Sequence, residues 1–315
     1  MTIWGVLFRW GSIKNDKPML KRTIYIGNPS YLKLKHKQLV IVNPETKDVR
    51  GTVPIEDMAL LLLDHPQITL SSLLIDRLMS HGVGVVHCDT HHLPNGLLLP
   101  LVGHSELTQR WNVQLGASMP LKKQLWKQTV LAKIENQKRI LQRYGGATAP
   151  MEQYMARTTS GDEENMEGKA ANHYWKQLFE NFQRHRFGHP PNNYFNFGYA
   201  ILRSIVARAL VSSGLLPAQG LFHKNKYNPY CLADDVMEPY RPFVDQLIMA
   251  YLEEHTPEME LSTQEKGYLL QIATQDVFID HKVRPLMVAV STTTASLYKC
   301  FTGERRTILY PLVIT

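Results

Sequence analysis

Short hydrophobic runs separated by turn-forming residues fill the first third of the chain. Their β-branched or alternating pattern predicts strands, because alternation places every second side chain on the same face of a sheet. These runs lie at residues 22–27, 31–36, 38–43 and 50–55. The run "MALLLL" at Met58–Leu63 is apolar throughout, which is typical of a strand covered on both faces. A helix is expected over about residues 71–81, with Ser71 or Ser72 as its cap and Gly82 as its stop, followed by a strand at residues 83–88.

A helical period replaces this alternation after about Gly103. In residues 121–146 the hydrophobic side chains recur at helical spacing, and the opposite face is basic. Its cations are Lys122, Lys123, Lys127, Lys133, Arg139 and Arg143. Such a face is either solvated or in contact with phosphates, and the residues alone leave both open. A second long helix is expected over residues 196–214, with Asn196 as its N-terminal cap and Gly214 at its end.

The two patterns predict an α+β protein of two domains. Residues 19–102 form the β-rich domain with one helix, and residues 103–315 form an all-helical domain. Residues 1–18 fit neither pattern and are interpreted as an N-terminal extension or as a start placed too early. A chain of 315 residues is long enough for two domains with a sizeable core.

Charge and cysteine usage narrow the class of protein. The net charge of +7 favours an acidic partner such as nucleic acid, although this concerns association and not the fold. The three cysteines are far apart and form no C-x-x-C pair, which argues against a zinc ribbon or a disulfide framework. The apolar runs are far below the ~20 residues that span a bilayer, and the N-terminus lacks signal-peptide features. A cytoplasmic protein that does not span a membrane is therefore expected.

Acidic residues gather in the stretch "LFHKNKYNPYCLADDVMEPYRP" at residues 221–242. On a helical wheel of about 100° per residue, Asp235 borders the apolar stripe, whereas Asp234 and Glu238 face away from it. Two carboxylates about 6 Å apart repel by only ~0.7 kcal/mol in water but by ~3 kcal/mol at an effective dielectric near 20. This segment is therefore either a solvated acidic helix or part of a cation site.

Glu167 and His223 add to this second possibility. Glu167 is in register with the inward face of a helix that it begins, where it is either a capping acid or a metal ligand. With the acids at 235–238 and the imidazole of His223, it would form a mixed oxygen and nitrogen set suited to Mg²⁺ or Mn²⁺. A rival metal site is the cluster "HCDTHH" at residues 87–92, although alternation along the expected strand points Cys88 away from His87 and Asp89.

Three segments in order give the chain a more specific resemblance. They are "SGDEENMEGKAANHYW", "NFGYAILRSIVARAL" and "GLFHKNKYNPYCLADDVMEPYRPFVD". The chain resembles, from about residue 19 to its C-terminus, the universal CRISPR-associated spacer integrase, a metal-dependent DNA endonuclease. It is most similar to the version found beside single-effector (type II) systems.

The resemblance implies a role for each of four residues. The metal-binding glutamate of the family falls on Glu167, its histidine on His223 and its final acid on Glu238. These three would bind Mg²⁺ or Mn²⁺, and Asp235 matches a further catalytic acid three residues before Glu238. Some members of the family have an aspartate at the final position. Asp234 matches no ligand and is expected at the surface.

The resemblance also implies partners and a reaction. The family acts as a homodimer, so residues 19–102 would be a dimerisation domain and residues 103–315 the catalytic domain. A small dimeric partner would complete a heterohexameric complex that joins the 3′ ends of short double-stranded DNA to the CRISPR repeat. The alternative is a non-catalytic nucleic-acid-binding scaffold of the same fold, whose acids serve only helix capping and solubility.

Overall fold

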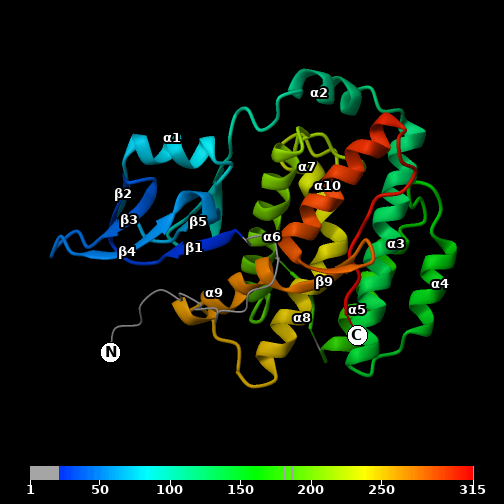
Figure 1. Ribbon diagram of the computed structural model, residues 1–315. Coiled ribbons are helices and arrows are strands. Elements are labelled where there is room, and N and C mark those ends of the chain that lie inside the picture. The colour runs from blue at the N-terminus through cyan, green and yellow to red at the C-terminus, as the bar shows by residue number, and fades with distance from the viewer. Residues whose placement is uncertain (1–20, 181, 186–187, 315) are drawn as a thin grey trace. The chain divides into compact units, whose positions relative to one another are not determined.

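The computed structural model describes residues 21–180, 182–185 and 188–314, so the extension expected at residues 1–18 lies outside the described residues. The chain forms two compact units (Figure 1). The first comprises residues 21–101 together with Ser262–Leu270, and the second comprises Val102–Leu261 and residues 271–314. The α+β class is confirmed. The sequence pattern divided the chain once near residue 102, whereas the structure places Ser262–Leu270 with the first unit.

The first unit contains two four-stranded sheets, with strand orders β1-β5-β7-β8 and β4-β3-β2-β6. Parallel pairs join β1 to β5, β5 to β7, and β2 to β6. The strands are β1 (Arg22–Ile26), β2 (Ser30–Lys35), β3 (Gln38–Val42), β4 (Val49–Pro54), β5 (Met58–Leu63), β6 (Ile68–Leu70), β7 (Gly84–Cys88) and β8 (Pro94–Leu98). The helical segments are η1 (Ile55–Asp57), α1 (Ser72–Ser80) and α9 (Thr263–Leu269).

The core of the first unit lies around β5 and α1. All six residues of β5 are buried, which confirms that this strand is covered on both faces. Helix α1 begins at the predicted cap, where the Ser71 hydroxyl accepts a hydrogen bond from the Leu74 amide, and buries Leu74 and Leu78. It ends before Gly82, whose φ of +66° favours glycine. Strands β6 and β8 were not predicted, because one has three residues and the other contains a proline, an asparagine and a glycine.

A buried ion pair joins α9 to the end of β5. The Asp64 carboxylate accepts hydrogen bonds from the Tyr25 hydroxyl at 2.6 Å and from the Lys266 Nζ at 2.7 Å. Its other oxygen lies 2.8 Å from the His92 Nδ1. The side chains of Asp64 and Lys266 are only 1% and 4% exposed. This cluster therefore ties a segment that is distant in sequence to the sheet of the first unit.

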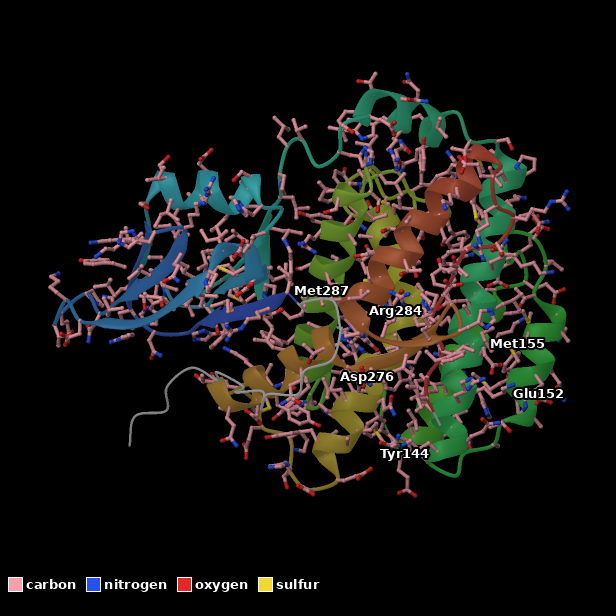
Figure 2. The ribbon with its side chains drawn as sticks, viewed as in Figure 1. Tyr144, Glu152, Met155, Asp276, Arg284 and Met287 are labelled. Carbon is pink, nitrogen blue, oxygen red and sulfur yellow. The ribbon has the colours of Figure 1, made fainter. Side chains whose placement is uncertain are left out.

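The second unit is helical, with one short hairpin. Its helices are α2 (Leu107–Leu115), α3 (Met119–Arg143), α4 (Ala149–Arg157), α5 (Met166–Leu178), α6 (Asn192–Ser212), α7 (Cys231–Met237), η2 (Glu238–Tyr240), α8 (Arg241–Leu252) and α10 (Leu286–Thr302). The 3₁₀ segment η3 (Leu270–Thr274) leads to β9 (Asp276–Ile279) and β10 (Lys282–Pro285). Asp276 and Arg284 mark the two strands of this hairpin in Figure 2. The hairpin is an addition to the helical domain that the sequence pattern predicted.

Helix α3 is central, because α4, α5, α8 and η2 all pack against it. It therefore buries more of its circumference than one apolar stripe, and Lys133 of the predicted basic face is 6% exposed. The expected cap of α6 is also wrong. This helix begins at Asn192 after Pro191, and Asn196 lies inside it. Its predicted end is confirmed, since Gly214 follows it with a φ of +70°.

None of the helices in the described residues is long and apolar enough to cross a lipid bilayer.

Candidate metal and DNA-processing site

Glu167 lies at the start of α5, where other side chains satisfy the free backbone amides. Asp162 accepts hydrogen bonds from the amides of Met166 and Glu167 at 2.8 and 2.9 Å, and Asn165 accepts one from Gly168 at 3.1 Å. Capping is therefore done by Asp162 and Asn165. The Glu167 side chain does not cap the helix but forms an ion pair with Lys133 on α3. The structure thus favours the inward interpretation of Glu167 over the capping one.

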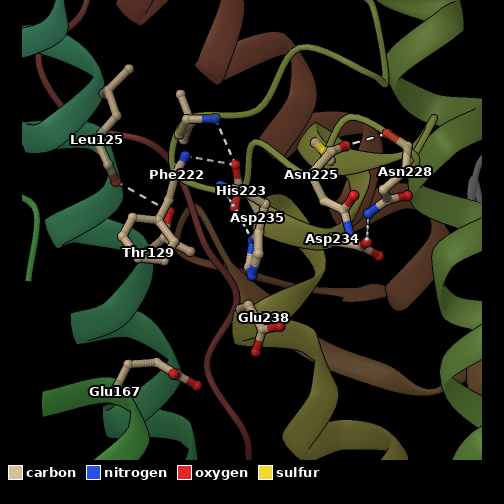
Figure 3. A network of polar contacts seen from close by, with 12 residues as sticks. Leu125, Thr129, Glu167, Phe222, His223, Asn225, Asn228, Asp234, Asp235 and Glu238 are labelled. Atoms are coloured by element: carbon tan, nitrogen blue, oxygen red, sulfur yellow. Dashed lines mark hydrogen bonds and ion pairs between the residues drawn. The ribbon is translucent and has the colours of Figure 1, made fainter. Parts of the chain in front are cut away.

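His223 is held by Asp235 on α7. Its Nδ1 lies 2.5 Å from Asp235 Oδ1. The same carboxylate also accepts the amides of Leu221, Phe222 and His223, at 2.6, 3.0 and 3.3 Å (Figure 3). Gly220 is required at the start of this turn, because a Cβ there would lie 2.4 Å from the His223 carbonyl oxygen. Asp235 thereby fixes both the turn and the imidazole ring.

Aromatic side chains complete the setting of His223. The Phe222 ring stacks on the buried Trp126 ring of α3, with 4.5 Å between centroids and 3° between planes. The His223 ring meets Trp126 edge-on at 5.8 Å. Hydrogen bonds on one side and packing on the other therefore hold the imidazole, whose side chain remains 42% exposed.

The acidic segment is buried, so its interpretation as a solvated helix is wrong. Asp234, Asp235 and Glu238 are 7%, 0% and 7% exposed. Asp234, expected at the surface, accepts a hydrogen bond from Arg203 Nε at 2.6 Å and one from Asn228 at 2.6 Å. The helical wheel assumed a single covered face, whereas every residue of the seven-residue helix α7 is buried.

Glu167 and Glu238 converge on one cation, the ammonium group of Lys133. Lys133 Nζ donates to Glu238 Oε2 at 2.5 Å and also donates to Glu167 Oε1. The other oxygen of Glu238 accepts a hydrogen bond from Arg241 Nε at 2.9 Å. The side chains of Lys133 and Glu238 are 8% and 9% exposed. Two carboxylates from segments 71 residues apart (238 − 167) are thus brought to one point.

The charges of this cluster are stabilised in their ionised forms. Burial alone would raise the pKa of Glu238, but the positive charges of Arg241 and Lys133 outweigh it and lower the pKa to about 2. Burial would likewise lower the pKa of Lys133, but Glu238 and Glu167 raise it. The hydrogen bond to Asp235 raises the pKa of His223, which burial opposes. Glu238 and Lys133 therefore depend on their partners to remain charged in the interior.

The donor chemistry of the site fits a hard divalent cation. Carboxylate oxygens with one imidazole are ligands typical of Mg²⁺ or Mn²⁺. In the structure, the cation between Glu167 and Glu238 is the Lys133 ammonium. Across residues 21–180, 182–185 and 188–314, no three His, Cys, Asp or Glu side chains form a group that could hold a metal. The structure thus joins the two glutamates through Lys133, and it pairs His223 with Asp235.

The cluster at residues 87–92 has other partners. His87 Nδ1 lies 2.8 Å from the Asn95 side-chain oxygen, and His92 is bonded to Asp64. Asp89 accepts the backbone amides of His91 and Leu93 and so closes a turn. Cys88 is buried whereas His87 is exposed, as alternation along the strand predicted. These contacts explain the residues as strand and turn elements.

Comparison with known families identifies the chain. Residues 24–282 match the family model described as "CRISPR associated protein Cas1". A CRISPR-associated endonuclease Cas1 from Neisseria meningitidis serogroup C (strain 8013) is 33% identical over 281 residues, which cover 88% of this chain and 91% of the relative. The chain belongs to the Cas1 family.

Solved structures with low sequence identity share the fold of this Cas1 chain. A casposase bound to integration product matches with a TM-score of 0.76 at 17% identity, covering 92% of both chains. A chain of a Cas6-RT-Cas1–Cas2 complex matches with a TM-score of 0.70 at 18% identity, covering 94% of this chain and 36% of that one. The matching family model and the Neisseria relative confirm the resemblance to the spacer-integrase family.

Lys133 is the residue of this Cas1 site that the sequence pattern missed. The sequence pattern assigns it to the basic face of this helix, opposite the apolar stripe, which would be solvated or in contact with phosphates. A sequence signal was present, since the polar residues Asn136 and Gln137 follow Lys133 after three and four positions and share its helix face. In the structure all three are buried, so this face packs against other parts of the chain and not against open water.

Another buried acid of this Cas1 unit predicts a pH dependence. Asp245 on α8 accepts hydrogen bonds from Tyr199 and Tyr174 at 2.5 and 3.0 Å. Burial raises its pKa to about 7, although both hydrogen bonds oppose the rise. The folded state therefore holds a proton that the unfolded chain releases above about pH 4, and the unfolding free energy falls by up to ~4 kcal/mol towards pH 8.

Asp245→Asn is expected to remove most of this slope, because an amide does not titrate. Urea unfolding of the wild type and the variant at pH 5, 6, 7 and 8 measures it. Equal slopes in the two proteins would contradict the assignment of this proton to Asp245.

Proposed function

We propose that this chain is a divalent-metal-dependent DNA endonuclease and integrase of CRISPR adaptation, which inserts short duplex DNA into the repeat array. The observation that carries the proposal is the convergence of Glu167 and Glu238 on a single cation, inside a chain of the Cas1 family. A scaffold that used these acids only for capping and solubility would have no reason to bring the buried Glu238 and the partly buried Glu167 to one positive charge.

The proposed metal ligands are Glu167, Glu238 and the Nε2 atom of His223. In the neutral ring of His223, Nδ1–H donates a hydrogen bond to the Asp235 carboxylate, and Nε2 keeps its lone pair. A bound Mg²⁺ or Mn²⁺ would polarise the phosphodiester and neutralise charge that develops on it. Asp235 is a positioning residue in this scheme, because it touches His223 and the backbone of the turn.

The proposed reaction exchanges one phosphodiester for another. The 3′-hydroxyl oxygen of the incoming DNA attacks the phosphorus and passes its proton to solvent. The bond to the 3′ oxygen of the cleaved strand breaks, and this leaving oxygen takes up a proton from solvent to become a free 3′-hydroxyl. Attack by water in place of the hydroxyl gives endonuclease cleavage. Neither version needs a covalent bond to the protein, so orientation and charge supply the catalysis.

Double-stranded DNA and two protein partners belong to the proposal. The proposed assembly is a homodimer formed through residues 19–102, joined to a small dimeric partner in a heterohexamer. The fold match to a chain of a complex that contains Cas1 and Cas2 supports the presence of a partner protein. The net charge of +7 supports binding to a polyanion. The match to a casposase bound to integration product supports strand transfer as the reaction class. The proposed place of action is the cytoplasm, where these DNA substrates are found.

A strand-transfer assay tests the proposal. The purified chain is mixed with its small partner, a labelled duplex with free 3′ ends, and a supercoiled plasmid that carries a CRISPR repeat. Joined product is expected with Mn²⁺ or Mg²⁺ and none with EDTA, while DNA binding measured by gel shift persists in both. Product formed equally in EDTA would overturn metal dependence. Binding without any product or cleavage under all metal conditions would favour the scaffold alternative.

A further inference from the structure

Lys133 lies where the proposed metal would lie. Its Nζ contacts one oxygen of Glu167 and one of Glu238, the two carboxylates that the proposed function assigns as metal ligands. Residue 133 as a whole is 6% exposed, so water does not screen these contacts strongly. The ammonium therefore directly compensates the negative charges of the buried Glu238 and the partly buried Glu167.

The charge balance leaves no room for both cations. Glu167 and Glu238 supply two negative charges, and Lys133 and Arg241 already supply two positive charges at the same carboxylates. A divalent ion added beside Lys133 would leave two excess positive charges in a buried cluster. Such an excess is costly at low dielectric, so the ammonium has to leave the carboxylates when the ion enters.

Lys133 is not needed to fix the positions of the two glutamates, because other residues do so. Asp162 and Asn165 cap the helix that carries Glu167. Arg241 holds the second oxygen of Glu238. The lysine acts on the charge of the pair, while other residues set the positions of the segments.

We infer that Lys133 is a built-in counter-cation, which stabilises the Glu167–Glu238 pair without metal and competes with Mg²⁺ or Mn²⁺ for it. This inference rests on the proposed function. Its direct consequence is that the wild-type chain binds divalent metal more weakly than its ligands alone would allow, since each binding event must break the two ion pairs of Lys133. A lysine that only oriented the carboxylates would have the opposite effect, because its loss would weaken metal binding.

Isothermal titration of Mn²⁺ into the wild-type protein, Lys133→Gln and Lys133→Arg separates these roles. Glutamine removes the charge but keeps a hydrogen-bond donor, whereas arginine keeps the charge. Lys133→Gln is expected to bind Mn²⁺ at least about tenfold more tightly than the wild type. It is also expected to have a lower melting temperature without metal and a larger rise in that temperature with Mn²⁺. Lys133→Arg is expected to stay within about threefold of the wild-type affinity.

Unchanged or weaker Mn²⁺ binding by Lys133→Gln would overturn the inference, while Mn²⁺ binding by the wild type would leave the proposed function standing. If neither protein bound Mn²⁺, the proposed function itself would fail. A crystal structure of the wild type with Mn²⁺ is an independent test, because it does not depend on the folding of any variant. Lys133 Nζ is expected to have left at least one of the two carboxylates there, and an ammonium still bonded to both beside the ion would refute the competition.

Discussion

Glu167→Gln and Glu238→Gln are each expected to lower the rate of strand transfer by about 10³-fold or more, while DNA binding changes little. Each substitution keeps the size of the side chain and removes one of the two negative charges that converge on the cation site. Loss of one preorganised electrostatic contact in an active site typically costs 10²–10³-fold, and loss of a metal ligand costs at least as much. Single-turnover strand transfer and gel shift on the same preparations measure the two effects.

Glu164→Gln is the matched control for these variants. Glu164 precedes α5 by two residues, is half exposed and pairs with Arg157. It should retain the wild-type rate, because an exposed ion pair contributes little. His223→Ala is expected to behave like the two site variants. Wild-type rates in the Glu167, Glu238 and His223 variants, with folding verified by circular dichroism, would show that the site is assigned to the wrong residues.

Order along the chain carried most of the information about the candidate site. The sequence predicts four site residues, Glu167, His223, Asp235 and Glu238. The structure joins Glu167 to Glu238 through Lys133, and it joins His223 directly to Asp235. Their roles as metal ligands and support remain a proposal. The burial of Asp234 could not be predicted, because a helical wheel considers one helix and not the helices that surround it.

The fold prediction succeeded for elements whose local sequence alone indicates their type and burial. The six buried residues of β5 and the serine-capped helix α1 follow from local sequence. The hairpin of β9 and β10 was missed, since its strands have four residues each. The assignment of α9 to the first unit could not be predicted either, because it depends on the contact between Lys266 and Asp64. Hydrophobic periodicity reports on local structure and does not indicate contacts between residues so far apart in the sequence.

Asp64→Asn is expected to destabilise the first unit by about 3–5 kcal/mol. The substitution keeps the shape and leaves the buried Lys266 ammonium without its carboxylate, which is the costly way to break a buried ion pair. Amide hydrogen exchange of β5 reports on this unit alone, because all six of its residues lie in the core. Protection of these amides should fall by about two to four orders of magnitude.

Two further variants show whether the charge is responsible. Asp76→Asn lies on the exposed face of α1 and is expected to change the stability by less than about 0.5 kcal/mol. The double variant Asp64→Asn with Lys266→Met should recover most of the lost protection, since it removes the unpaired ammonium. If the double variant were as unstable as Asp64→Asn alone, the loss would come from packing or from the hydrogen bonds of Tyr25 and His92.

The insertion of α9 into the first unit also sets the order in which the protein can finish folding during synthesis. Asp64 and Lys266 are 202 positions apart, which a ribosome covers in roughly 10 to 40 s at ~5–20 residues per second. Until then, the emerging sheets have their apolar core but not the lysine that neutralises Asp64. The N-terminal unit is thus completed only after most of the helical unit has been made, and a fragment ending at Leu101 would lack a part of its own fold.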